Sequence, residues 1–86
     1  MRVRIPSPLH SYSAGSSLVE ANGRTVDEVL LQLDARFPGT RFRIIDEQDA
    51  IRPHIRLFVD GKPTAALNGA LTPTSELMIV CALSGG

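Results

Sequence analysis

Cysteine and histidine are scarce in this sequence. Among its 86 residues are one cysteine and two histidines. Cys81 has no second cysteine with which to form an internal disulfide, and together with His10 and His54 it falls short of the four ligands of a structural zinc site. The chain therefore has to fold on its apolar core alone, and we expect a reducing, cytoplasmic setting.

A surplus of charge and long apolar runs are also missing. Nine Lys and Arg balance nine Asp and Glu, whereas a protein that binds the phosphate backbone of nucleic acids needs surplus positive charge. No apolar run approaches the ~18 residues of a membrane span, and none follows the charged N-terminal residues as it would in an export signal. We expect a soluble protein that binds neither nucleic acid nor a membrane.

Length and periodicity predict one domain that begins with a hairpin and a helix. Residues 2–5 alternate polar and apolar side chains, and 17–21 form a second short strand that precedes the breaker at 22–24. Thr25 and Glu28 form a capping box, in which the Thr25 hydroxyl can accept from the Glu28 N–H and the Glu28 carboxylate from the Thr25 N–H. The helix should end by Phe37, before Pro38 and Gly39, and Leu31 lies off its apolar stripe, which consists of Val26, Val29, Leu30, Leu33 and Phe37.

The second half of the sequence predicts three more strands. Residues 40–52 fit neither period, so we expect irregular chain with one short helical turn. Residues 54–59 are a strand, Asp60-Gly61 is the strongest short hairpin signal, and 62–67 return at a sheet edge because of Pro63. Residues 77–83 are a continuous apolar strand. This order of elements predicts an α+β roll with the helix on one face of the sheet.

The last strand is apolar on both of its faces. Leu77, Ile79 and Cys81 alternate with Met78, Val80 and Ala82. A chain of this length cannot supply a second covering layer, so one face should remain open. Phe58 joins the outward set if Ile55, Leu57 and Val59 point inward. We therefore expect an exposed patch opposite the helix that binds a protein partner; it consists of Phe58, Met78 and Val80.

Side-chain catalysis is poorly supported. His10 lies in a Pro/Ser-rich loop and His54 at a strand start, with no nucleophile at a suitable spacing. Cys81 is expected to be a small buried apolar residue, because no adjacent cation would lower the pKa of its thiol. An acidic cluster lacks EF-hand spacing and indicates a solvated loop; it consists of Asp46, Glu47 and Asp49.

The remaining candidate is the tail, Leu83-Ser84-Gly85-Gly86. Two glycines have no Cβ, so they can thread a slot too narrow for other residues. A terminal α-carboxylate, with a pKa of about 3.3–3.7, is ionised at neutral pH. It can attack the α-phosphorus of ATP once Mg²⁺ and a partner's cations screen the repulsion. The resulting acyl-adenylate is open to attack by a sulfur nucleophile.

Together these features resemble the ThiS/MoaD family of bacterial ubiquitin-like sulfur carriers. The resemblance covers essentially the whole chain and is strongest in residues 52–61 and in the apolar last strand that leads into the tail. It implies a ubiquitin-like β-grasp roll over residues 1–82, with a mixed sheet of four to five strands and one main helix. It also implies that residues 83–86 form a flexible C-terminal tail.

The resemblance further implies that the chain is not an enzyme but a protein co-substrate that binds no cofactor. An E1-like adenylyltransferase/sulfurtransferase would use ATP and Mg to adenylate Gly86 and convert it to a thiocarboxylate, with Gly85 as the slot-threading spacer. The sulfur would pass to a biosynthetic enzyme, of the cysteine or molybdopterin (molybdenum cofactor) pathways. The partner-binding residues would be Phe58, Met78, Val80, Leu83 and Ser84.

Two alternatives remain open. The chain could be a ubiquitin-type modifier joined to lysines through Gly86, which shares the adenylate and differs in the acceptor. It could also be a plain β-grasp interaction module whose Gly-Gly ending is accidental, because a fold does not fix a function. Gel shifts of acceptor proteins would favour the modifier, and a small-molecule sulfur product would favour the carrier.

Overall fold

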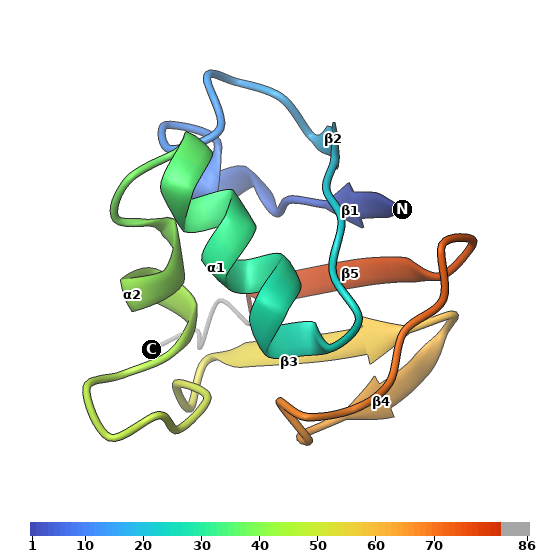
Figure 1. Cartoon of the computed structure of the whole chain (residues 1–86). Coiled ribbons are helices and arrows are strands. Elements are labelled where there is room, and N and C mark those ends of the chain that lie inside the picture. Colours follow the sequence, from blue (N-terminus) through green and yellow to red (C-terminus); the bar gives the residue numbers. More distant parts are fainter. Residues whose placement is uncertain (82–86) are drawn as a thin grey trace.

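The computed structural model describes residues 1–81, which form one five-stranded sheet with helices on one face (Figure 1). The strands are β1 (Arg2–Arg4), β2 (Leu18–Glu20), β3 (Ile55–Val59), β4 (Lys62–Thr64) and β5 (Glu76–Cys81). The helices are α1 (Val26–Arg36), the short α2 (Thr40–Ile44) and the 3-10 turn η1 (Ser7–Leu9). This arrangement confirms the predicted α+β roll.

The strands are ordered β2-β1-β5-β3-β4 across the sheet. β1 runs parallel to β5, and the other neighbouring pairs are antiparallel, so the sheet is mixed. The last strand therefore occupies the centre. β4 lies at an edge, as Pro63 predicted, because a proline cannot donate to a second neighbouring strand.

The hydrophobic core lies between the sheet and the helices. The predicted stripe of α1 is confirmed, since four of its residues are buried and Phe37 packs against them from the end of the helix. The fully buried side chains come from both layers: Val3, Val26, Val29, Leu30, Leu33, Ile44, Ile45, Ile55, Leu57, Leu77 and Ile79. Leu31, off the stripe, is 51% exposed.

The start of α1 confirms half of the predicted capping box. The Thr25 hydroxyl accepts from the Glu28 N–H at 3.2 Å, as expected. The reciprocal contact was predicted one residue too late, because the Glu28 carboxylate accepts from the Arg24 N–H at 3.0 Å. A short bridge between Thr25 and Ala70 holds the chain that enters the helix, with the Leu71 N–H donating to the Arg24 carbonyl at 2.9 Å.

Replacing the cap should have a measurable cost. Thr25→Ala leaves the Glu28 N–H without its side-chain acceptor, so we expect a loss of about 1 kcal/mol in the free energy of unfolding, measured by urea denaturation. Thr25→Ser keeps the hydroxyl and is the matched control. Equal losses in both variants would show that the hydroxyl contributes nothing and that the methyl group matters instead.

Several boundaries in the second half differ from the sequence prediction. The returning strand β4 ends at Thr64 and not at residue 67, because the chain turns, with the Gly69 N–H donating to the Ala66 carbonyl at 3.0 Å. The predicted short helical turn is α2. The hairpin at Asp60-Gly61 is confirmed by positive φ angles of 51° and 83°, which match a type I′ turn.

Candidate functional site

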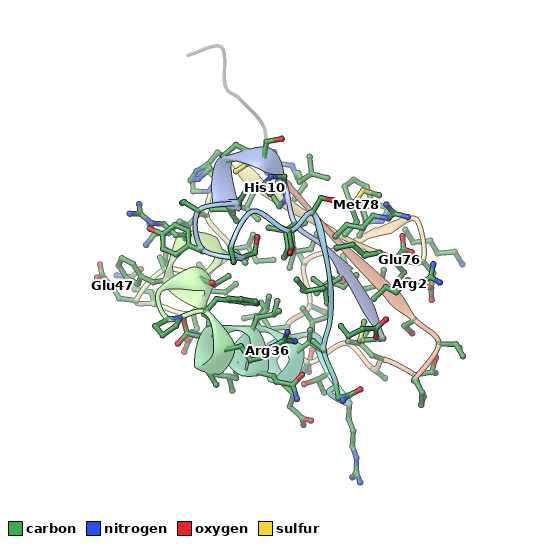
Figure 2. The ribbon with its side chains drawn as sticks, turned by 90° about the horizontal axis from the view of Figure 1, so that it is seen from above. Arg2, His10, Arg36, Glu47, Glu76 and Met78 are labelled. Carbon is green, nitrogen blue, oxygen red and sulfur yellow. The ribbon has the colours of Figure 1, made fainter. Side chains whose placement is uncertain are left out.

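The outer face of the sheet, away from the helices, carries the predicted apolar patch. Phe58 lies directly opposite Met78 on the neighbouring strand, and Val80 lies opposite Arg56. The strand register is confirmed, because Leu57 and Ile79 point inward and are each 2% exposed. Figure 2 shows the Met78 side chain on the side of the sheet away from the helices. We call the set Phe58, Met78 and Val80 the outer patch.

The outer patch is half-buried and not fully open as predicted. Its neighbours in the sheet explain the partial cover. Arg4 lies beside Met78 on β1, Arg56 beside Val80 on β3, and Pro63 beside Phe58 on β4. Long arginine stems can lie along apolar side chains while their charged ends reach water. The face therefore combines an apolar centre with a cationic border.

Charged side chains lie around the outer patch on four strands. Arg2, Glu20 and Glu76 stand level with one another at the start of β5, Arg4 stands level with Met78, and Arg56 stands level with Val80, one residue before Cys81. Arg4 Nε donates to Glu76 Oε1 at 2.8 Å, with both side chains partly exposed. The sequence analysis did not single out Arg4 or Arg56. The alternation at residues 2–5 placed Arg4 on the polar face of its strand, but it did not predict that Arg4 would lie beside Met78.

The other candidates from the sequence serve packing or local structure. Cys81 lies opposite Ile55 and packs against the core as predicted, but it is half-buried and not buried. The His10 ring lies with Nε2 2.9 Å from the Ile5 carbonyl oxygen, and His54 is exposed. Neither histidine lies in the outer patch.

The acidic cluster of Asp46, Glu47 and Asp49 lies in a loop whose backbone N–H groups bind Asp46. Asp46 Oδ1 accepts from the N–H groups of Ala50 and Gln48 at 3.0 and 2.8 Å, which lowers the pKa of that carboxyl below its usual value. Asp49 accepts from Arg41 Nη2 at 3.4 Å. Within residues 1–81, no three His, Cys, Asp or Glu side chains are placed to hold a metal ion.

The predicted tail residues, Leu83, Ser84, Gly85 and Gly86, lie outside the described residues, as does the expected boundary between residues 82 and 83. The structure places the last described residue, Cys81, at the end of the central strand, opposite Ile55 and next to the Val80–Arg56 pair. None of the helices in residues 1–81 is long and apolar enough to cross a membrane.

Comparison with known proteins finds relatives of this chain by structure but not by sequence. Neither the family models nor the curated protein sequences give a match to this chain. Solved structures do. A chain of the BexX/CysO complex from Amycolatopsis orientalis is 27% identical, with a TM-score of 0.90 over 99% of this chain and 98% of that one. CysO from Mycobacterium tuberculosis is 23% identical, with a TM-score of 0.88 over 95% and 98%.

Small archaeal modifier protein 1 from Haloferax volcanii is also similar. It is 25% identical, with a TM-score of 0.76 over 100% of this chain and 98% of that one. These proteins share one ubiquitin-like β-grasp fold with this chain over almost their full lengths. The structure and these likenesses confirm the resemblance to the ThiS/MoaD family of ubiquitin-like proteins that residues 52–61 and the last strand indicated.

Proposed function

We propose that the chain is a sulfur carrier whose working group is the α-carboxylate of Gly86. The observation that carries the proposal is the combination of a CysO-like fold with a sequence that continues from the central strand β5 to Gly85-Gly86. A carrier needs a rigid body that a partner can recognise and a narrow tail that reaches the partner's reacting atoms. Here the sheet would supply the first and the two glycines the second.

The chemistry takes place on the tail in two steps. A carboxylate oxygen of Gly86 attacks the α-phosphorus of ATP, and pyrophosphate leaves. Hydrosulfide then attacks the carbonyl carbon of the acyl-adenylate, AMP leaves with the bridging oxygen, and the product is a thiocarboxylate. An E1-like adenylyltransferase supplies the ATP, the Mg²⁺ and the cations that stabilise the phosphate charge. The carrier itself contributes no catalytic side chain.

The outer patch is the proposed docking surface for this enzyme. It is apolar at its centre, as protein interfaces are, and its members Val80 and the adjacent Arg56 lie near the end of β5 from which the sequence leads into the tail. A partner seated there would hold the start of the tail in a fixed direction. Leu83 and Ser84 would then be the first tail residues that the partner contacts.

A ubiquitin-type modifier is the second candidate function. The 25% identity with a small archaeal modifier protein over the whole chain favours it. Both functions begin with the same adenylate and differ in the nucleophile, which is a sulfur donor for the carrier and a lysine amine for the modifier. The two functions can be separated by mass: an acceptor protein that gains about the mass of this chain on a lysine would indicate the modifier.

Intact mass spectrometry tests the proposal. The purified chain is incubated with ATP, Mg²⁺, a sulfide source and an E1-like enzyme that is active on another carrier. We expect one oxygen to be replaced by one sulfur, and fragmentation to place the change on Gly86. An unmodified carboxylate beside a modified second carrier would overturn the sulfur-carrier proposal and favour a plain interaction module.

Cys81 should be dispensable for this reaction. Cys81→Ala keeps a small apolar side chain at the edge of the core, so we expect a loss of roughly 1 kcal/mol in the free energy of unfolding and normal thiocarboxylate formation. Denaturation curves and the same mass measurement check both halves. A folded variant that forms no thiocarboxylate would instead make Cys81 a sulfur relay.

A further inference from the structure

Two exposed apolar side chains lie together on the helix side of the molecule. The most exposed large apolar residues described are Leu18, Leu31 and Phe42, at 44%, 51% and 54%. Leu31 of α1 and Phe42 of α2 line one hollow of about 410 Å³, together with Ile45. Figure 1 shows the two helices side by side on the inner face of the sheet. We call this site the helix-side hollow.

The lining of this hollow carries more negative than positive charge. Its lining includes a single cation, Arg41, and the carboxylates of Asp34, Asp46, Glu47 and Asp49. Arg41 is already engaged, because its Nη2 lies 2.8 Å from Asp27 Oδ1 and 3.4 Å from Asp49 Oδ1. The chain as a whole is neutral. The lining of the hollow is therefore net negative, although the Arg52 guanidinium stands beside it, over the Phe42 ring.

The backbone holds two of these carboxylates in fixed positions. Asp34 Oδ1 accepts from the N–H groups of Gly39 and Arg41 at 3.0 and 3.1 Å. Asp46 Oδ1 accepts from two N–H groups of its own loop. In each case Oδ1 accepts both hydrogen bonds, and within residues 1–81 Oδ2 accepts none. Glu47 makes no side-chain hydrogen bond or ion pair within that range, and Figure 2 shows it at the outer edge of the helix side.

We propose that the helix-side hollow binds a protein segment in which an apolar side chain is flanked by lysines or arginines. The apolar group would cover Leu31 and Phe42, and the cations would meet the carboxylates around them. The Arg52 guanidinium carbon lies 4.5 Å from the centroid of the Phe42 ring, so the chain's own cation covers part of that ring and a partner would contact the part that stays exposed. Because α1 separates this site from the sheet, such a partner would leave the outer patch free.

A defined peptide tests the proposal. The probe is a synthetic hexapeptide with a Leu-Phe centre between two Lys-Lys pairs, titrated into the full ¹⁵N-labelled chain. We expect backbone amide shifts in residues 31–34 and 39–49, and affinity that falls as salt is added. Leu31→Ser and Glu47→Lys should each weaken binding at least about fivefold. Leu18→Ser removes an exposed leucine outside the hollow and should bind as the unchanged chain does.

Several results would overturn the proposal. A peptide with Glu in place of every Lys that bound equally well would remove the charge argument. Amide shift changes centred on the outer patch, or no shift changes at millimolar peptide, would show that the helix-side hollow is not the binding site. The dispersion of each variant's spectrum shows whether it is folded. Glu47→Lys changes only an exposed side chain, so it keeps the test decisive even if Leu31→Ser is destabilised.

Discussion

Deleting Gly86 is expected to abolish thiocarboxylate formation while the fold stays intact. The shortened chain would present the carboxylate of Gly85 one residue, about 3.5 Å, short of the α-phosphorus in the partner's pocket. A displacement of that size removes the alignment on which attack depends, and misplacement by about 1 Å already costs about a hundredfold in rate. The measurement is the intact mass of the product beside that of the unchanged chain.

Two further variants separate reach from chemistry. Gly86→Trp keeps the length of the tail but adds a side chain that a narrow slot should refuse, and a Ser appended after Gly86 removes the free carboxylate at that residue. We expect both to be inactive. Because the buried core described lies before Cys81, all three variants should unfold within about 0.5 kcal/mol of the unchanged chain. Normal modification of any of them would contradict the proposed role of Gly86.

Local sequence signals predicted most elements of this fold. The stripe on α1, the cap at Thr25, the positive φ angles at Asp60 and Gly61, and the edge position of Pro63 all depend on residues close in sequence. The outer patch followed from alternation alone, because side chains in a strand point to opposite faces with a period of two. These are the features for which neighbouring residues determine the outcome.

Contacts between distant residues were beyond local signals. The parallel pairing of β1 with β5 joins the two ends of the described chain, and nothing in either segment specifies the other as its neighbour. The position of Arg4 beside Met78 follows from that pairing, so the cationic border could not be predicted. The same limit applies to the chain that enters α1, because its bridge pairs Thr25 with the distant Ala70.

The outer patch and the helix-side hollow suggest a division of tasks between two faces. One face has an apolar centre with arginines at its border, and the other has exposed Leu31 and Phe42 among carboxylates. Opposite borders favour partners of opposite charge, since like charges across an interface repel and so exclude the wrong partner. An activating enzyme on the outer patch and a basic protein segment in the helix-side hollow would therefore not compete for the same surface.

Phe58→Asp is expected to weaken binding to the activating enzyme by about 2 kcal/mol, roughly thirtyfold in Kd. Phe58 lies between Met78 on one neighbouring strand and Pro63 on the other, so its ring forms the middle of the apolar surface. The change removes that area and leaves an unpaired carboxylate at the interface. Isothermal titration calorimetry with the purified enzyme measures the loss directly.

Leu31→Asp is the matched control, because it places the same charge on a leucine that is 51% exposed on the helix side. It should bind the activating enzyme normally. Phe58→Ala removes the ring without adding charge, so it should weaken binding less than Phe58→Asp does. The difference between the two variants separates the apolar contribution from the electrostatic one. Asp is unfavourable in a strand, so each variant is first shown to unfold cooperatively at a similar denaturant concentration. If Phe58→Asp is folded and binds as tightly as Leu31→Asp, the enzyme does not use the outer patch, and docking has to depend on the tail alone.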